Sequence, residues 1–299
     1  EYWSVSGDFE NKEGNINAKL ITIGNQKVAT GSSFDKKTGQ LFNKDDIILN
    51  QKLIDGFSEQ LKKDEWSVTK LEKKPVTQKP YAPFITSTLQ QEGIRQFRMS
   101  AQNVMRTAQT LYENGYITYM RTDSVHLSKE AISASRKEIK KLYGNEFLPE
   151  SPIQYSNKVK NAQEAHEAIR PAGSTFKHPD DLKNKLDSNQ LKLYTLIWKR
   201  TLASQMKNAK IQRTNLWLSN GEYTFEAKGK VVLFPGFLKV YVEATDNKKD
   251  RDDNELILPD VKENDKLTCL ELESKQHFTK PINRFTEASL VKELEKLGI

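Results

Sequence analysis

The chain of 299 residues has a single cysteine, Cys269. One thiol cannot form a disulfide within the chain and cannot supply a cysteine-rich zinc site, so the disulfide-stabilised and zinc-finger classes are excluded. We expect a chain of this kind in a reducing compartment such as the cytoplasm.

Long apolar runs are also missing, and the longest are short, as in Val-Val-Leu-Phe at 231–234. A membrane-spanning helix needs about 20 apolar residues, so we expect no membrane partner. The charged, tyrosine-containing start resembles no signal peptide. The sequence starts at Glu1 without a methionine, and it stops at Ile299, where a predicted helix is ending. We therefore expect an excised fragment.

The sequence has no glycine-rich phosphate loop, so no ATP site is expected. The acidic pairs at 45–46 and 252–253 lack the spacing of a metal site and are interpreted as surface. His166 begins His-Glu-Ala-Ile-Arg, but the second histidine of a zinc helix is replaced by Arg170. We therefore expect no metal bound by these residues themselves.

Charge is unevenly distributed along the chain. The formal net charge is +7, and all of this excess lies in residues 79–206, whereas 1–78 and 207–299 are each neutral. Such a surplus is modest and is compatible with an ordinary solvated surface. It is also the sign that a polyanion-binding segment requires.

The periodicity of apolar residues predicts a discontinuous arrangement. Strands are predicted at 15–23, 66–72, 213–218, 222–228, 237–243 and 267–273, and helices at 45–61, 99–112, 128–143 and 189–206. Asn220-Gly221 is a strong hairpin signal, and three prolines at 74–83 suit an extended crossing. We expect an α+β fold in which a β-rich domain, 1–78 and 207–285, is interrupted by a mainly helical domain, 79–206. Residues 286–299 would begin a further helical segment.

Residues 115–124 read Gly-Tyr-Ile-Thr-Tyr-Met-Arg-Thr-Asp-Ser and contain the parts of a tyrosine nucleophile. A phenol has a pKa near ~10, so some ~4 kcal/mol of help is needed to reach the phenolate at neutral pH. If the segment is extended, Tyr119 and Arg121 project to one side, where the guanidinium can hold a phosphate. Asp123, two residues further on, could orient Arg121.

This stretch resembles the active-site motif of the type IA DNA topoisomerases, and Met120 resembles the bacterial topoisomerase I branch of that family. Three further blocks resemble the family in the same order. They are Ala-Pro-Phe-Ile-Thr-Ser-Thr-Leu-Gln-Gln-Glu at 82–92, Asn-Ala-Gln-Glu-Ala-His-Glu-Ala-Ile-Arg-Pro at 161–171, and Phe-Thr-Glu-Ala-Ser-Leu-Val-Lys-Glu-Leu-Glu-Lys-Leu-Gly-Ile at 285–299. The resemblance covers essentially the whole chain.

The resemblance implies roles for particular residues. Tyr119 would be the nucleophile, Arg121 the cation on the scissile phosphate, and His166 a second phosphate contact, with Asp123 orienting the histidine or Arg121. Contacts with DNA or the floor of the active site are expected from Thr118, Thr122, Gln109, Glu113 and Arg170. For Arg170 a purely structural role in its loop is the alternative.

The resemblance further implies single-strand cleavage through a 5′-phosphotyrosine, strand passage and resealing without ATP, in an arch whose far end carries the tyrosine. Mg²⁺ would be bound by an acidic N-terminal domain that has no counterpart in these residues. The fragment alone is therefore expected to be inactive in relaxation. The expected partner is DNA, with single strands preferred, and the expected state is a monomer in the bacterial cytoplasm, associated with the nucleoid.

Three other interpretations remain. A tyrosine recombinase or type IB topoisomerase also uses tyrosine on phosphate, but its tyrosine follows the catalytic histidines and arginines, whereas Tyr119 precedes His166. A duplex-binding module would not depend on the hydroxyl of Tyr119. A protein-interaction scaffold would show no salt-dependent binding to DNA.

Overall fold

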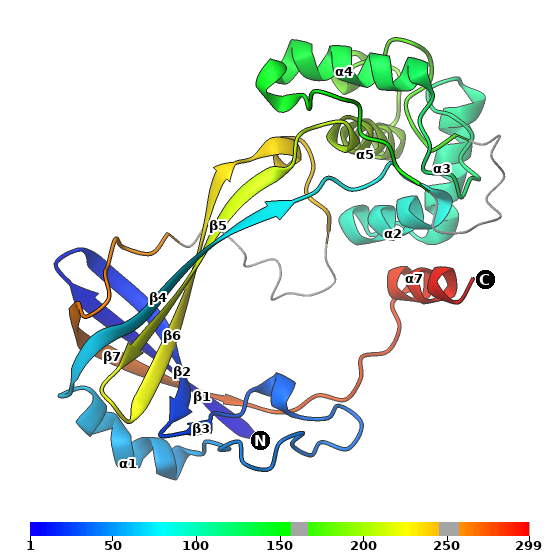
Figure 1. Ribbon diagram of the computed structural model, residues 1–299. Helices are drawn as coiled ribbons and strands as arrows, with labels where there is room; N and C mark the ends of the chain where they lie inside the picture. Colours follow the sequence, from blue (N-terminus) through cyan, green and yellow to red (C-terminus); the bar gives the residue numbers. More distant parts are fainter. Residues whose placement is uncertain (157–166, 245–256, 299) are drawn as a thin grey trace. The chain divides into compact units, whose positions relative to one another are not determined.

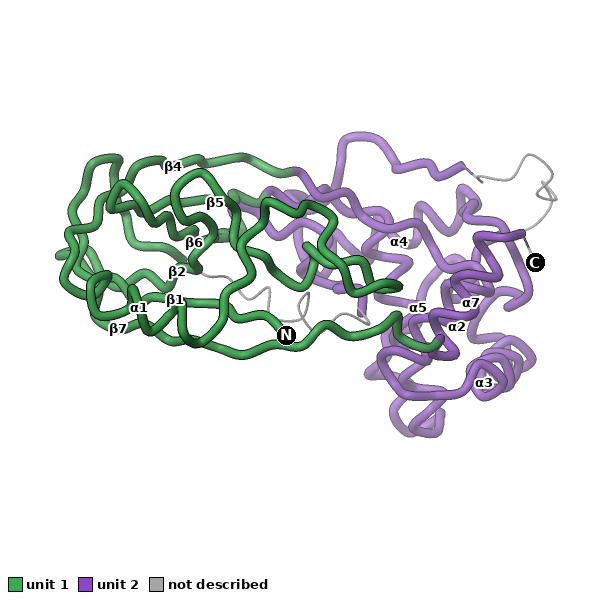
Figure 2. The backbone as a smooth tube through the Cα atoms, turned by 90° about the horizontal axis from the view of Figure 1, so that it is seen from below, with its two compact units in different colours: residues 1–76, 211–232, 253–284 green, residues 77–210, 233–252, 285–299 purple. Residues whose placement is uncertain are grey.

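The computed structural model describes residues 1–156, 167–244 and 257–298, and the chain folds into two compact units. Unit 1 comprises residues 1–76, 211–232 and 253–284, and unit 2 comprises 77–210, 233–252 and 285–299 (Figure 2). The chain therefore leaves unit 1 and returns to it twice.

Unit 1 is built on antiparallel strands (Figure 1). The strands are β1 (Tyr2–Asn11), β2 (Gly14–Ile23), β3 (Gln26–Lys27), β4 (Glu65–Gln78), β5 (Ala209–Ser219), β6 (Tyr223–Phe234) and β7 (Lys266–His277). Their order is β1-β7-β4-β5-β6-β2-β3, and an additional pairing of β1 with β2 closes six of them into a ring. Closure leaves these six strands without an open edge.

The interior of this barrel is apolar because burial alternates along the strands. In β2, Ile16, Ala18 and Leu20 are buried, and the residues between them are exposed. Three rings contributed by different strands meet edge to face, with centroids 5.1 to 5.2 Å apart. They are Phe9, Trp66 and Phe225.

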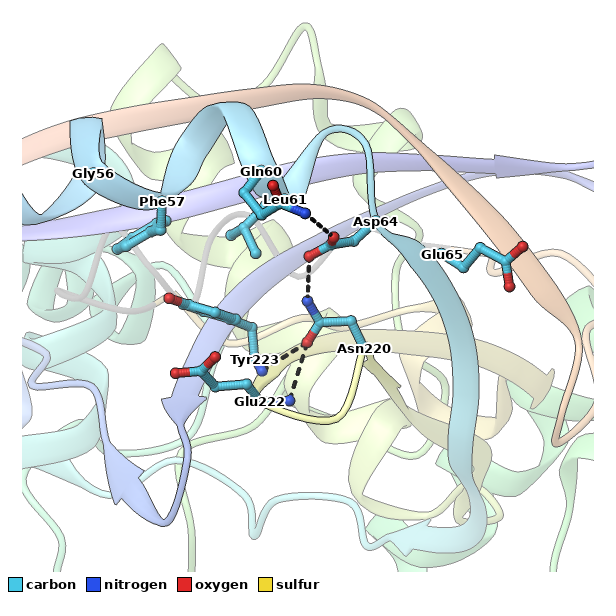
Figure 3. Close-up of a pocket in the computed structure, with 9 residues that line it drawn as sticks. All are labelled: Gly56, Phe57, Gln60, Leu61, Asp64, Glu65, Asn220, Glu222 and Tyr223. Atoms are coloured by element: carbon cyan, nitrogen blue, oxygen red, sulfur yellow. Dashed lines mark hydrogen bonds between the residues drawn. The ribbon is translucent and has the colours of Figure 1, made fainter.

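Helix α1 (Gln51–Leu61) and the β5–β6 hairpin flank a pocket of about 570 Å³ in unit 1 (Figure 3). Asp64 joins the two elements, because Gln60 Nε2 and Asn220 Nδ2 each donate to its carboxylate at 2.7 Å. The Asn220 side chain also accepts from the backbone N–H of Tyr223 at 2.8 Å. These bonds fix the hairpin that Asn220-Gly221 predicted.

Unit 2 is mainly helical (Figure 1). It contains α2 (Thr86–Phe97), α3 (Ala101–Glu113), α4 (Lys129–Tyr143), α5 (Ser188–Ser204) and α7 (Glu287–Leu297), with short 3-10 turns at Asn145–Phe147, Pro179–Leu182 and Gly236–Lys239. Ser100 and Ser128 cap α3 and α4 by accepting from the backbone N–H three residues on. The core is centred on α5, where Leu193, Tyr194 and Ile197 are buried.

The structure differs from the sequence prediction in four places. No strand forms at 237–243, which is a 3-10 turn followed by coil, and 233–252 belong to unit 2. Residues 286–299 also belong to unit 2 rather than to a further segment, because α7 packs on α2. The helix predicted over 45–61 begins only at Gln51, where Asn50 caps it by accepting from Leu53 N at 2.9 Å. β1 and α2 were not predicted, and the predicted loop at 246–255 lies outside the described residues.

Candidate active site

Residues 115–124, here called the tyrosine segment, begin at a fixed turn. Gly115 follows the end of α3 with φ of +71°, a left-handed conformation that favours glycine. Its N–H donates to Tyr112 O at 2.9 Å, and Tyr116 N donates to Leu111 O at 2.8 Å. The helix therefore ends sharply, and the next residues start from a rigid point.

Parts of three sequence blocks, 82–92, 115–124 and the described residues 167–171 of the block 161–171, are brought together here. The tyrosine segment is joined to the third block by Thr118 N, which donates to Arg170 O at 2.9 Å. It is joined to the first block by Thr86 N, which donates to Thr122 O at 3.0 Å. Isolated β-bridges complete the arrangement at Phe84–Ile169 and Ile117–Pro171. The described residues of these three blocks therefore form one local structure.

Burial alternates along the tyrosine segment even though it is not a regular strand. This alternation gives the two-residue period that the sequence predicted, with one set of side chains anchored and the other presented to solvent. The buried residues are Met120, Thr122 and Ser124, and the exposed residues are Tyr119, Arg121 and Asp123.

The side chain of Tyr119 is 46% exposed, and its ring lies against Tyr112 of α3, with centroids 5.2 Å apart and an angle of 66° between the planes. Its hydroxyl makes no hydrogen bond to any described residue. The ring is therefore held by an aromatic contact while the oxygen remains accessible.

Arg121 and Asp123 do not form an ion pair with each other or with any other described residue. The other expected partner of Asp123, His166, lies outside the described residues. The roles of these three residues stay predictions.

The two threonine hydroxyls are used within the fold. Thr118 Oγ1 donates to Ala168 O at 2.7 Å and accepts from Arg170 N at 3.0 Å. Thr122 is 8% exposed, and its Oγ1 accepts from Ser124 N at 3.0 Å. Contact of Thr118 with a phosphate would require loss of an existing bond, and DNA contact by both residues stays a prediction.

Gln109 and Glu113 lie on the exposed face of α3, as their spacing predicts, and Gln109 Nε2 donates to Glu113 Oε1 at 2.8 Å. Tyr112 lies one residue before Glu113. It is 42% exposed and contacts the tyrosine segment.

Arg170 is 6% exposed and is bound within its own loop, which favours the structural alternative over contact with DNA. It donates from Nε and Nη2 to the carboxylate of Glu167 at 3.0 and 2.9 Å, and from Nη1 to the carbonyls of Pro171 and Gly173. Burial raises the pKa of Glu167, but hydrogen bonds from Arg170 and Ser128 outweigh burial and lower the pKa overall. Because Ser128 caps α4, Glu167 joins that helix to the loop beside the tyrosine.

A second buried arginine, Arg200 of α5, was not found from the sequence. It is 4% exposed, donates from Nε to Ala82 O at 2.6 Å, and donates from Nη1 to Tyr241 Oη and Glu243 Oε1 at 2.9 and 3.1 Å. Its guanidinium also lies over the ring of Phe84, 4.7 Å from the centroid. Arg200 thereby fixes residues 82–84, which pair with the third block, and no local sequence signal marks it.

Among residues 1–156, 167–244 and 257–298, no group of three or more His, Cys, Asp or Glu side chains could hold a metal ion. Each helix in these ranges is too short or too polar to traverse a lipid bilayer.

The sequence model of a family described as DNA topoisomerase matches residues 1–299. A protein named DNA topoisomerase 1 from Synechococcus elongatus is 47% identical, over 100% of this chain and 34% of the relative. A protein of the same name from Mycolicibacterium smegmatis is 45% identical, over 100% of this chain and 33% of the relative. The structure of full-length topoisomerase I from Thermotoga maritima superimposes with a TM-score of 0.72 at 30% identity, over 100% of this chain and 44% of that chain. This chain thus spans about a third of the length of the two curated relatives, and the predicted α+β fold is confirmed.

Proposed function

The chain belongs to the DNA topoisomerase family, and on this premise we propose that it is the tyrosine-bearing part of a type IA enzyme. In this proposal Tyr119 cleaves one strand of DNA. The whole enzyme then passes a strand, reseals the break and relaxes negatively supercoiled DNA. The observation that carries the proposal is the exposure of Tyr119 and Arg121 from a segment whose intervening residues are buried.

The chemical step is a transfer of phosphorus between oxygens. The phenol of Tyr119 gives up its proton and Oη forms a bond to phosphorus, while the bond from phosphorus to the 3′ oxygen breaks. That oxygen leaves with the electron pair and takes up a proton, so no proton is gained or lost overall. The products are a 5′-phosphotyrosine and a free 3′-hydroxyl. The reverse reaction reseals the strand, and because one ester replaces another, no ATP is required.

In this mechanism Arg121 binds the scissile phosphate and stabilises the charge that develops on its oxygens. It is exposed, and among the described residues it has no carboxylate partner that a phosphate would have to displace. A pre-aimed donor of this kind contributes about 2.7–4 kcal/mol of transition-state stabilisation. His166 would make a second phosphate contact, with Asp123 orienting it.

No step of this mechanism is assigned to a metal, because the described residues contain no suitable group of ligands. We propose that Mg²⁺ acts in the longer enzyme, bound by a domain outside these 299 residues. The 299-residue chain alone should then fail to relax DNA. We also propose a monomer that prefers single strands and acts on the bacterial nucleoid in the cytoplasm.

The test is covalent trapping of a labelled oligonucleotide by the full-length enzyme. Tyr119→Phe removes only one hydroxyl, so binding and folding should persist while the adduct disappears. Arg121→Ala should suppress the adduct at every pH between about 5.5 and 9, because a guanidinium keeps its charge throughout that range. A Tyr119→Phe enzyme that still forms the adduct would end the proposal.

His166→Ala separates the histidine from the arginine. If His166 binds phosphate as a cation, its contribution increases as pH falls, so its removal should flatten the acid side of the pH profile of cleavage. An unchanged profile would remove His166 from the mechanism and leave Tyr119 and Arg121 in place.

A further inference from the structure

Helix α4 has two chemically different faces. The inner face contains Ala131, Ile132, Ala134, Ser135, Glu138 and Ile139, all buried. The exposed residues of the outer face include the lysines at 129, 137, 140 and 141, together with Ser133 and Glu130. Residues 129, 133, 137 and 140 are spaced by four, four and three, so they follow one stripe along the helix.

The side-chain ammonium groups of these four lysines make no hydrogen bond or ion pair to any part of the chain that the structure describes. Elsewhere exposed lysines do find carboxylates, as Lys183 does with Asp180 at 2.7 Å. The exposed acid of α4 is Glu130, which lies in the first turn, where the helix N-terminus favours a carboxylate. The outer face of α4 therefore has an uncompensated positive charge.

Helix stability explains only part of this pattern. Lys140 and Lys141 lie in the last turn, where cations interact favourably with the helix dipole. Lys129 is the first residue of the helix, where a cation opposes the dipole, and Lys137 lies in neither terminal turn. A ligand that requires positive charge along the whole stripe accounts for Lys129 and Lys137 as well as for Lys140.

We propose that the outer face of α4 binds the phosphate backbone of double-stranded DNA, at a place separate from Tyr119. The helix has 15 residues and a length of about 22 Å, along which duplex DNA presents a phosphate charge every ~1.7 Å. Proteins that bind single strands rely on exposed aromatic rings, and the exposed residues of α4 include none. This inference goes beyond strand cleavage and does not require it.

The experiment compares two triple variants of the 299-residue chain that lose the same charge. One is Lys129→Gln, Lys137→Gln and Lys140→Gln on α4. The matched control is Lys36→Gln, Lys37→Gln and Lys52→Gln, three exposed lysines of unit 1. Binding of a labelled blunt duplex and of a single strand is titrated by anisotropy at 50 and 200 mM salt. Glutamine has a helix propensity similar to that of lysine, and circular dichroism checks that both variants are folded.

Each lost phosphate contact should reduce the magnitude of the slope of log affinity against log salt by about 0.9. With three lysines replaced, the slope of the α4 variant should be smaller in magnitude by ~2.7. The fourfold salt change should then weaken duplex binding about 40-fold less in this variant than in the unmodified chain. The control variant should keep the original slope, and single-strand affinity should change little. Equal slopes for the two variants, or no duplex binding by the unmodified chain, would overturn the proposal. Neither result would affect cleavage by Tyr119, which Tyr119→Phe tests independently.

Discussion

Tyr112 and Tyr119 lie edge to face, with ring centroids 5.2 Å apart, and this contact joins the last turn of α3 to the proposed nucleophile. Both rings are exposed, at 42% and 46%. The Tyr119 hydroxyl has no hydrogen-bond partner among the described residues, so we expect the aromatic contact to orient its side chain.

Tyr112→Ala should therefore slow formation of the covalent adduct in the full-length enzyme. An edge-to-face pair is worth about 0.5–1.5 kcal/mol, which corresponds to a roughly 2- to 10-fold lower rate. Tyr112→Phe keeps the ring and should restore the rate, and DNA affinity should be similar in both variants. Gln102→Ala, an exposed change on the same helix, is the control. An equal loss in the Phe and Ala variants would contradict a role for ring packing.

Glu167 should make the stability of unit 2 depend on acid. Although burial raises the pKa of Glu167, the hydrogen bonds from Arg170 and Ser128 lower it overall from its ordinary value of 4.5. A carboxyl group whose pKa is lower in the folded state stabilises the fold above the unfolded pKa, and this contribution is lost as pH falls through the folded value. Denaturant unfolding from about pH 6 down to pH 3 should show the loss, and Glu167→Gln should reduce its size. If the free energy of unfolding fell equally with pH in Glu167→Gln and in the unmodified chain, this contribution of Glu167 would be excluded.

Arg200→Met should destabilise unit 2 by about 2–3 kcal/mol, because it removes the buried donor to Ala82 O and to the partly exposed carboxylate of Glu243. Arg200→Lys keeps the charge but not the planar fork, so it should recover only part of the loss. Urea unfolding followed by circular dichroism measures both. Unchanged stability of the Met variant would show that this network contributes little.

Arg98→Gly should stabilise the chain. Arg98 ends α2 in the left-handed region, with φ of 56° and ψ of 31°, where a residue with a Cβ is strained and glycine is not. We expect a gain of about 0.5–1 kcal/mol and a rise in the melting temperature of about 1–4 °C. Arg106→Gly, at an exposed position inside α3, should instead lower it by a similar amount. A lower melting temperature for Arg98→Gly would contradict the strain.

The sequence by itself determined the local features of this protein. Hydrophobic period predicted α3, α4 and α5, and in the structure Ser100 and Ser128 satisfy backbone donors next to them in the chain. Asn220-Gly221 predicted the β5–β6 hairpin, and Gly115 ends α3 for a similarly local reason, its left-handed backbone conformation. The two-residue period at Tyr119 and Arg121 also follows from neighbouring residues.

Tertiary structure decided the features that depend on distant partners. Burial of Arg170 and Arg200 is stable because Glu167, Tyr241, Glu243 and several carbonyls surround them. The sequence left a structural role for Arg170 as one alternative and did not mark Arg200. The turn at 236–239 and α7 belong to unit 2 through packing that no local pattern contains. The contact of Tyr112 with Tyr119 is of the same kind, because the tyrosine segment is held by hydrogen bonds to Thr86 and Arg170 and by a bridge to Pro171, all distant in the sequence.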